Sequence, residues 1–179
     1  MNWRFTLLIA ATVMLLTQPA LARPKYKITE VVHAETKLTG ASTVDIAVPQ
    51  DGQYGGKTYK GSGQAAADAT RAAFAQHLQK ADIVSGTAGQ GVEQARAAAA
   101  SAGYGYYCQL EILQWVDRAT EWSGKRDTIE VKLSLYDTAT GTLIYSAIIQ
   151  GYSKFWTFGG DHPQDLAFAH MHVLVDKLF

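Results

Sequence analysis

A strict alternation of apolar and polar side chains over residues 128–136 constrains the fold of this chain more than any other feature. Apolar residues occupy every second position, at Ile129, Val131, Leu133 and Leu135. A period of two is typical of a β-strand that buries one face and exposes the other to solvent. The turn-forming segment 137–141 ends in Gly141, so we expect residues 142–152 to return as the second strand of an antiparallel hairpin.

The rest of the chain divides into strand and helix patterns. We expect further strands over residues 43–49, 82–84 and 104–113, and helices over residues 63–80, 92–102 and 163–178. Residues 23–39 form a lead-in of mixed composition. Two early crossovers through helices favour parallel neighbours, whereas the later hairpins force antiparallel ones. The predicted fold is therefore a single α+β domain, with a mixed five-stranded sheet in the order β-α-β-α-β-β-β-α and helices mainly on one face.

The first 22 residues have the order of a secretory signal peptide. A positive charge at Arg4 precedes an apolar run over residues 5–16, and the small residues Ala20 and Ala22 stand where signal peptidase cuts. The run is too short to span a membrane, which takes about 20 apolar residues. We therefore expect cleavage before Arg23, a periplasmic domain over residues 23–179, and no transmembrane segment after cleavage.

Charge and cysteine content narrow the classes of partner. The chain has 16 basic and 16 acidic residues, so it lacks the basic excess that a general nucleic-acid binder needs. Cys108 is the only cysteine, and it falls on the apolar face of the strand pattern over 104–113, where we expect a buried thiol. No cysteine directly follows the apolar N-terminal run, so we expect no lipid anchor.

The sequence contains no motif for cofactor or metal chemistry. Residues 61–63 (Gly-Ser-Gly) open a predicted helix, whose N-terminus is a possible anion site, but neither a P-loop nor a dinucleotide fingerprint surrounds them. A helix capped by Ser62 is the simpler interpretation. His170 and His172 are two positions apart and so lie on different sides of a helix, unlike a helical metal pair. We expect no cofactor and no metal site.

The segment 114–127 joins two predicted strands and is much longer than a hairpin requires. It is rich in Trp and Arg, the residue types that dominate binding hot spots. A second aromatic cluster follows the fifth strand, and antiparallel pairing should bring it to the same end of the sheet. We therefore predict a binding surface formed by Trp122, Arg118, Glu121, Trp115 and Trp156.

A structural alternative uses the same residues. In this alternative the tryptophan rings pack on one another and close that end of the core, with Arg118 paired to Asp117 or Glu121. Trp115 directly continues a strand, so we expect it to be at least partly structural. Trp122 lies deeper in the segment and is the better candidate for contact with a partner.

Four stretches of the sequence carry a resemblance to a known family. They are residues 46–55 (IAVPQDGQYG), 59–63 (YKGSG), 115–124 (WVDRATEWSG) and 160–166 (GDHPQDL). Together they resemble the DUF4823 family of small envelope proteins of Gram-negative bacteria, which are often lipoproteins and have no assigned activity. The resemblance covers about residues 26–179 and implies an envelope protein, but it implies no catalytic residues. This chain lacks the lipid-bearing cysteine of many members.

Two functions from different classes follow from these patterns. The favoured one is a non-enzymatic periplasmic domain that binds an unknown envelope protein or ligand through the aromatic end of its sheet. The alternative is a hydrolase that acts on cell-envelope material, with acids drawn from Asp117, Glu121 and Asp161 and a base from His162. A carboxylate and His162 within hydrogen-bond reach in a pocket would favour the enzyme, whereas a filled aromatic patch would favour binding.

Overall fold

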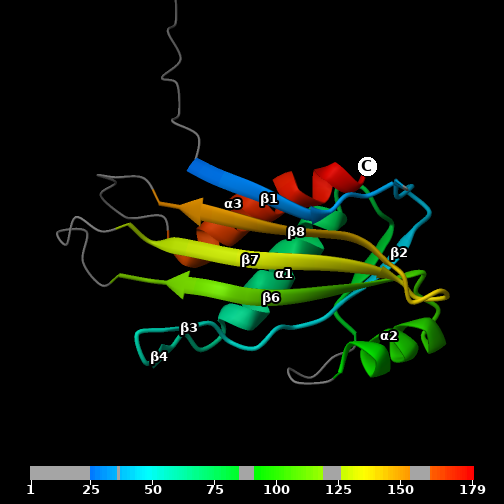
Figure 1. Cartoon of the computed structure of the whole chain (residues 1–179), viewed down its shortest axis with the longest axis horizontal. Helices are drawn as coiled ribbons and strands as arrows, with labels where there is room; N and C mark the ends of the chain where they lie inside the picture. Colours follow the sequence, from blue (N-terminus) through cyan, green and yellow to red (C-terminus); the bar gives the residue numbers. More distant parts are fainter. Residues whose placement is uncertain (1–24, 36, 85–90, 119–125, 154–161) are drawn as a thin grey trace, which may run out of the picture.

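A computed structural model of the chain describes residues 25–35, 37–84, 91–118, 126–153 and 162–179 (Figure 1). The described residues form, in chain order, β1 (Lys25–Val32), β2 (Thr43–Ile46), β3 (Gln53–Tyr54), β4 (Lys57–Thr58), α1 (Ser62–Phe74), β5 (Lys80–Asp82), α2 (Val92–Ser101), β6 (Tyr106–Val116), β7 (Thr128–Asp137), β8 (Leu143–Tyr152), α3 (Pro163–Val175) and the short 3₁₀ helix η2 (Asp176–Leu178).

Six of the described strands form one mixed sheet, in the order β1-β8-β7-β6-β2-β5. Strands β6, β7 and β8 are antiparallel neighbours, and β1 pairs antiparallel with β8 at one edge. Strand β2 pairs parallel with both β6 and β5 at the other edge, because helices form the crossovers between these strands. The predicted α+β class and the mixed sheet are confirmed.

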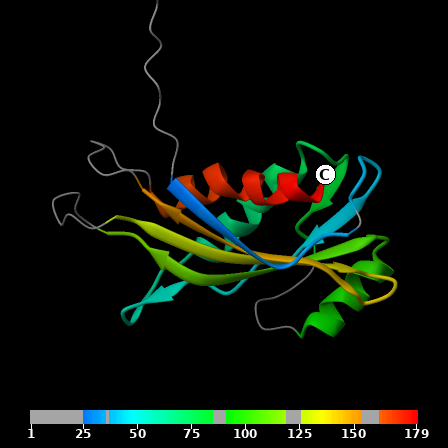
Figure 2. The ribbon, with the colours of Figure 1, turned by 45° about the horizontal axis from the view of Figure 1, so that its top comes forward.

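Helices α1 and α3 lie side by side on one face of the sheet, which we call the inner face (Figure 2). The alternating residues of β7 point into this layer and have no exposed surface: Ile129, Val131, Leu133 and Leu135. They form one core cluster with Phe74 of α1 and with Leu166 and Met171 of α3. The period-two pattern therefore predicted the buried face of this strand correctly.

Helix α2 packs on the opposite, outer face, next to β6 (Figure 2). It contributes Ala95 and Ala99 to a second, smaller cluster that contains Tyr104 and Tyr107. Side chains as small as alanine let the helix approach the sheet closely. Of the three α-helices among the described residues, two thus cover the inner face, which agrees with the prediction of helices mainly on one face.

The sheet has one strand more than predicted. Strand β1 lies in the segment that we expected to be a lead-in, and each of its residues is exposed or half-buried. An edge strand of this kind has no fully buried face, so its sequence carries only a weak hydrophobic period. The strand is defined by its pairing with β8, from Lys25 opposite Tyr152 to Val32 opposite Ser146.

Element boundaries also differ from the predicted ones. Helix α1 ends at Phe74 and not at residue 80, because a tight turn follows in which the backbone N–H groups of His77 and Leu78 both donate to the Phe74 carbonyl. Strand β5 therefore begins at Lys80. The glycine-rich loop after β2 contains a short antiparallel ribbon, β3–β4, that the sequence did not predict.

The single thiol behaves as its position predicted. Cys108 on β6 has no exposed surface and belongs to the inner core cluster. Burial raises the pKa of this thiol, and the negative charge of Asp45 raises it further. A thiol held neutral inside a core is a poor nucleophile, so Cys108 serves packing.

Candidate functional site

Four strand ends meet at one end of the sheet, which we call the loop end. The register places Val116 opposite Thr128, Thr128 opposite Tyr152, and Tyr152 opposite Lys25. The connections that leave the loop end run through residues 119–125 and 154–161. These two segments contain Glu121, Trp122 and Trp156, which lie outside the described residues. The antiparallel register thus brings the flanks of both predicted aromatic segments together.

Asp127 joins three of these strand ends. Its carboxylate accepts a hydrogen bond from the backbone N–H of Arg118 (2.7 Å), and its own N–H donates to Ser153 Oγ (2.9 Å). Burial raises the pKa of the Asp127 carboxyl, and the charge of Asp117 acts in the same direction. The bond from Arg118 and the positive charge of Arg118 act against this rise, as does His162 when it is protonated. The ends of β6, β7 and β8 are therefore held as one unit.

Arg118 is half-buried beside this network. Its Nε donates to the backbone carbonyl of Arg126 (3.2 Å), so the side chain bridges the two sides of the connection between β6 and β7. The structural alternative had paired Arg118 with Asp117 or Glu121. Glu121 lies outside the described residues, so its pairing with Arg118 stays a prediction. Among the described residues, the Arg118 side chain bonds to the Arg126 carbonyl, and its backbone N–H bonds to Asp127.

Asp117 and His162 come together at the loop end, as the hydrolase alternative requires. His162 precedes α3, where its backbone N–H donates to the Asp165 carboxylate (3.2 Å). Its Nδ1 lies 3.7 Å from Asp117 Oδ1, and the His162 side chain is 68% exposed. Proton transfer between side chains needs a contact of about 2.6–3.2 Å. This geometry gives an electrostatic contact when His162 is protonated, in a setting open to solvent.

Trp115 belongs to the core. It is 1% exposed and lies in the inner cluster, opposite Ile129 of β7. Gly52 approaches it so closely that a Cβ on Gly52 would stand 2.6 Å from Trp115 Cβ. The expectation that Trp115 is at least partly structural is confirmed, and its ring offers almost no surface to a partner.

The N-terminus of α1 is occupied by a side chain from the preceding loop. The Asp51 carboxylate accepts hydrogen bonds from the backbone N–H groups of Gly63 (2.9 Å) and Gly61 (3.1 Å). These bonds lower the pKa of the Asp51 carboxyl, with the bond from Gly63 having the largest effect. The possible anion site at this helix end is therefore filled by the protein itself.

The prediction that Ser62 caps α1 is wrong. The helix begins at Ser62, and its hydroxyl accepts a bond from the backbone N–H of Gly52 (2.8 Å). Sequence reasoning missed Asp51 because its partners follow about ten residues later, beyond the range of a local capping motif. The signal that could have found it is an Asp-Gly pair in a glycine-rich loop directly before a helix without an acidic first turn.

Three of the four family-like stretches meet at this point. The loop with Asp51 and Gly52 contacts both the start of α1 and Trp115, and the fourth stretch reaches Asp117 through His162. Over the described residues, no group of three or more His, Cys, Asp and Glu side chains is placed to hold a metal ion. None of the helices in that part of the chain is long and apolar enough to cross a membrane.

The fold and the family comparison define a class of protein. The family model described as "Domain of unknown function (DUF4823)" matches residues 36–178, and the chain belongs to this family. No curated protein matches the chain in sequence.

Comparison with solved structures gives a likeness of fold to PelC, together with two weaker matches. The PelC dodecamer from Paraburkholderia phytofirmans is 12% identical, with a TM-score of 0.67 over 86% of this chain and 97% of that chain. A DUF330-family protein from Xanthomonas campestris is 14% identical, with a TM-score of 0.49 over 80% of this chain and 88% of that chain. Lipoprotein GNA1162 from Neisseria meningitidis is 14% identical, with a TM-score of 0.35 over 62% and 83%. At these identities the PelC match is a likeness of fold.

Proposed function

We propose that this chain is a non-enzymatic accessory domain of the periplasm that binds an envelope component through the loop end of its sheet. The observation that carries the proposal is the register of β6, β7 and β8, whose ends all flank the two Trp-containing segments. The proposed contact residues are Trp122, Glu121, Trp156 and Arg118, and the buried Trp115 supports the strand end beneath them.

The proposed location depends on the N-terminal segment. Its apolar run and the small residues Ala20 and Ala22 support export with cleavage before Arg23. The mature protein should begin at Arg23 and appear in the soluble periplasmic fraction. N-terminal sequencing of protein from a fractionated cell tests this, and a retained Met1 or an acylated membrane form would contradict it.

The fold match to PelC supports an extension of the proposal to self-assembly. The PelC structure is a dodecamer, and the match covers nearly the whole of that chain. We therefore expect copies of this chain to associate in a defined number. Light scattering coupled to size exclusion measures the mass of the particle, and a monomer at every concentration tested would contradict the extension.

The decisive experiment compares two sets of aromatic variants. Trp122→Ala with Trp156→Ala should reduce the capture of an envelope component by crosslinking and pull-down from envelope extract, while the melting temperature stays within a few degrees of wild type. Phe168→Ala is the matched control, because Phe168 is a 49% exposed aromatic residue on α3 outside these segments. Unchanged capture by the double variant, or its failure to fold, would show that these tryptophans are not a contact surface.

The hydrolase alternative has one specific observation in its favour, the approach of Asp117 to His162. Their distance of 3.7 Å and the exposure of His162 support an electrostatic contact more than acid–base catalysis. Asp161 and Glu121, the other proposed acids, lie outside the described residues. Binding is therefore the function that the geometry supports best.

A further inference from the structure

Helix α2 is held to the protein by far fewer buried side chains than the other helices. It buries only Ala95 and Ala99. Helix α1 buries Phe74 together with four alanines and one threonine. Helix α3 buries several large side chains, among them Leu166, Met171 and Leu174. Because the free energy of burial grows with apolar area, α2 gains the least from its contact with the sheet.

The surface beneath α2 is aromatic and polar. Tyr107 of β6 is 3% exposed, and its ring lies 6.4 Å from that of Tyr136 on β7. Asp45 stands opposite Tyr107 in the parallel register and has no exposed surface. Burial raises the pKa of Tyr107 to about 12, and the Asp45 charge contributes to this rise. These hydroxyl and carboxylate groups would be solvated if the helix moved away, which lowers the cost of uncovering them.

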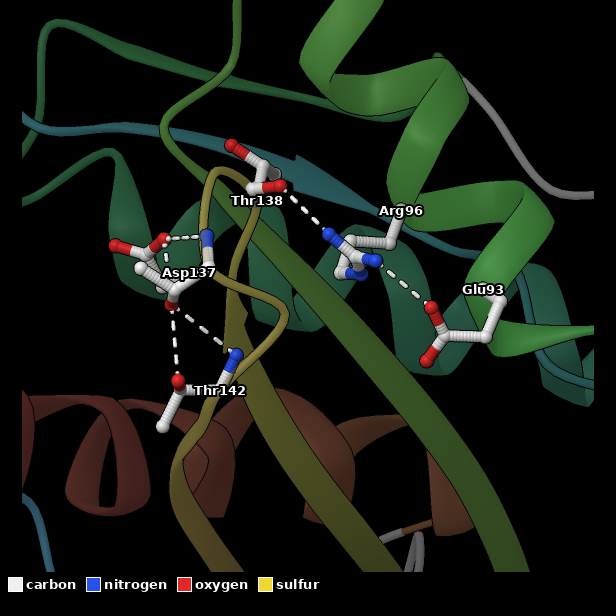
Figure 3. A network of polar contacts seen from close by, with 6 residues as sticks. Glu93, Arg96, Asp137, Thr138 and Thr142 are labelled. Carbon is white, nitrogen blue, oxygen red and sulfur yellow. Dashed lines mark hydrogen bonds and ion pairs between the residues drawn. The ribbon is translucent and has the colours of Figure 1, made fainter.

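One arginine ties α2 to the turn between β7 and β8 (Figure 3). Arg96 Nη1 donates to the Thr138 carbonyl (2.7 Å), and its Nη2 contacts Glu93 of the same helix (2.7 Å). The Arg96 Nε is buried and has no hydrogen-bond partner among the described residues. The tether between the helix and the turn thus has one hydrogen bond, which an incompletely satisfied guanidinium donates to a carbonyl. The charge of Arg96 also attracts Asp137 in the same turn.

Glycines stand at both ends of α2. Gly91 is the N-cap residue and makes no side-chain capping bond. Gly103 follows the helix with φ 82°, a left-handed conformation that glycine adopts without strain. Each end can therefore change its backbone angles at little cost, unlike α1, whose first turn is fixed by Asp51.

We propose that α2 is a displaceable cover of the outer face. It separates from the sheet as a unit and exposes Tyr104, Tyr107 and Tyr136, while the six-stranded sheet and the inner helices stay folded. The fold thus contains a second, hidden aromatic surface at the end of the sheet opposite the loop end. This proposal is independent of the proposed function, because it involves neither Trp-containing segment.

Hydrogen exchange of the unmodified protein tests the proposal without any variant. The hydrogen-bonded amides of α2 should exchange about 100-fold or more faster than those of α1 and β6 under native conditions, because they open in a local transition. Equal protection of α2, α1 and β6 would mean that α2 opens only when the whole protein unfolds, and would overturn the proposal.

Thiol labelling gives an independent measurement, because the buried Cys108 reports global unfolding in the same molecule. The thiol introduced by Ala99→Cys should react faster than Cys108 by a similar factor. Ala67→Cys is the matched control on α1, where Ala67 is also fully buried, and its thiol should react at the rate of Cys108. Reaction of the thiol from Ala99→Cys at the Cys108 rate would contradict a local opening.

Removal of the tether should increase the opening selectively. Arg96→Ala should raise the exchange rate of α2 by about tenfold, the effect of a lost hydrogen bond to a charged group, and leave α1 and β6 unchanged. Arg71→Ala, in the last turn of α1 and exposed, is the matched control and should leave α2 exchange unchanged. A uniform rise over all elements in Arg96→Ala would show that Arg96 stabilises the whole domain instead.

Discussion

The inner and outer faces of the sheet are stabilised in different ways, although the same strands form both. On the inner face, the alternating residues of β7 have no exposed surface and pack on α1 and α3. On the outer face, β7 carries polar residues that pair across strands: Glu130 with Gln150 (3.4 Å), Lys132 with Glu111 (3.6 Å) and Ser134 with Ser146 (3.1 Å).

The two faces therefore have different roles: one supplies the stability of the fold, and the other the register of the strands. Buried apolar area supplies most of the free energy of folding. Each of these polar pairs, including the buried pair of Ser134 with Ser146, contributes only about 0–1.5 kcal/mol. Polar pairs across strands nevertheless favour one alignment, because a slip by one residue would put each partner on the wrong face. The inner face therefore holds the domain together, and the outer face keeps its strands aligned and stays compatible with solvent.

The largest expected effect comes from Trp115, at the loop end of the inner face. Trp115→Ala should lower the free energy of unfolding by about 3–5 kcal/mol, because it leaves a cavity against Gly52. Leu113→Ala on the same strand is the control, since Leu113 is 42% exposed, and it should cost less than about 1 kcal/mol. Urea denaturation measures the free energy of unfolding of both variants. Equal losses would show that buried and exposed side chains at this end of the sheet do not differ in their contribution to stability.

Leu133 and Lys132 test the two faces at adjacent positions of β7. Leu133→Ala should cost about 2–5 kcal/mol, because it removes a fully buried side chain from the core. Lys132→Ala should cost less than about 1 kcal/mol, because its pair with Glu111 is partly exposed. Equal changes in a chemical melt would show that the faces do not differ in this way.

A variant of Asp51 tests how much the cap at the N-terminus stabilises the inner helix α1, in contrast to the uncapped outer helix α2. Asp51→Ala should lower the free energy of unfolding by about 0.5–2 kcal/mol at neutral pH. Because the folded-state pKa of Asp51 is lowered, the wild type holds this stabilisation above the unfolded pKa near 4 and loses it as the pH falls through the folded pKa. The variant should therefore lose less stability than the wild type below about pH 4. Identical acid denaturation curves would argue against the cap.

The smallest expected changes in stability come from removing the hydroxyl groups of Tyr145 and Tyr104, one on each face of the sheet. The Tyr145 hydroxyl is buried on the inner side without a hydrogen-bond partner among the described residues, so Tyr145→Phe should be neutral within about 0.5 kcal/mol or stabilising. The Tyr104 hydroxyl donates to Asp82 (2.7 Å), so Tyr104→Phe should cost about 1 kcal/mol. Thermal melts measure the stability of the two variants. A larger loss for Tyr145→Phe than for Tyr104→Phe would contradict this expectation.

Sequence reasoning succeeded where local pattern and burial agree. The buried face of β7, the hairpin to β8 and the buried Cys108 all follow from period-two alternation. Strand β1 was missed because its identity depends on β8, more than 110 residues away along the chain, and not on its own composition. The end of α1 was placed six residues too far because an apolar period continues through the turn after Phe74.

The candidate site was predicted only in outline. Antiparallel pairing was enough to place the flanks of the segments 114–127 and 154–161 at one end of the sheet. The roles of single residues depended on tertiary neighbours: Arg118 bonds to the Arg126 backbone, and Asp51 caps a helix that begins eleven residues later. Neither contact corresponds to a local capping or pairing motif, and only the Asp-Gly pair in the loop before α1 pointed towards Asp51.

The close approach of Gly63 to Pro49 has a consequence for how relatives of this chain are recognised. A Cβ on Gly63 would stand 2.2 Å from the Pro49 carbonyl oxygen. Any residue larger than glycine at position 63 would therefore force one of the two backbone segments to move. Family-like stretches of the chain coincide with such a contact between segments. Their recurrence in another protein would therefore indicate a shared architecture before it indicated a shared partner. A search for proteins of like function should therefore compare the residues of the loop end and not these glycines.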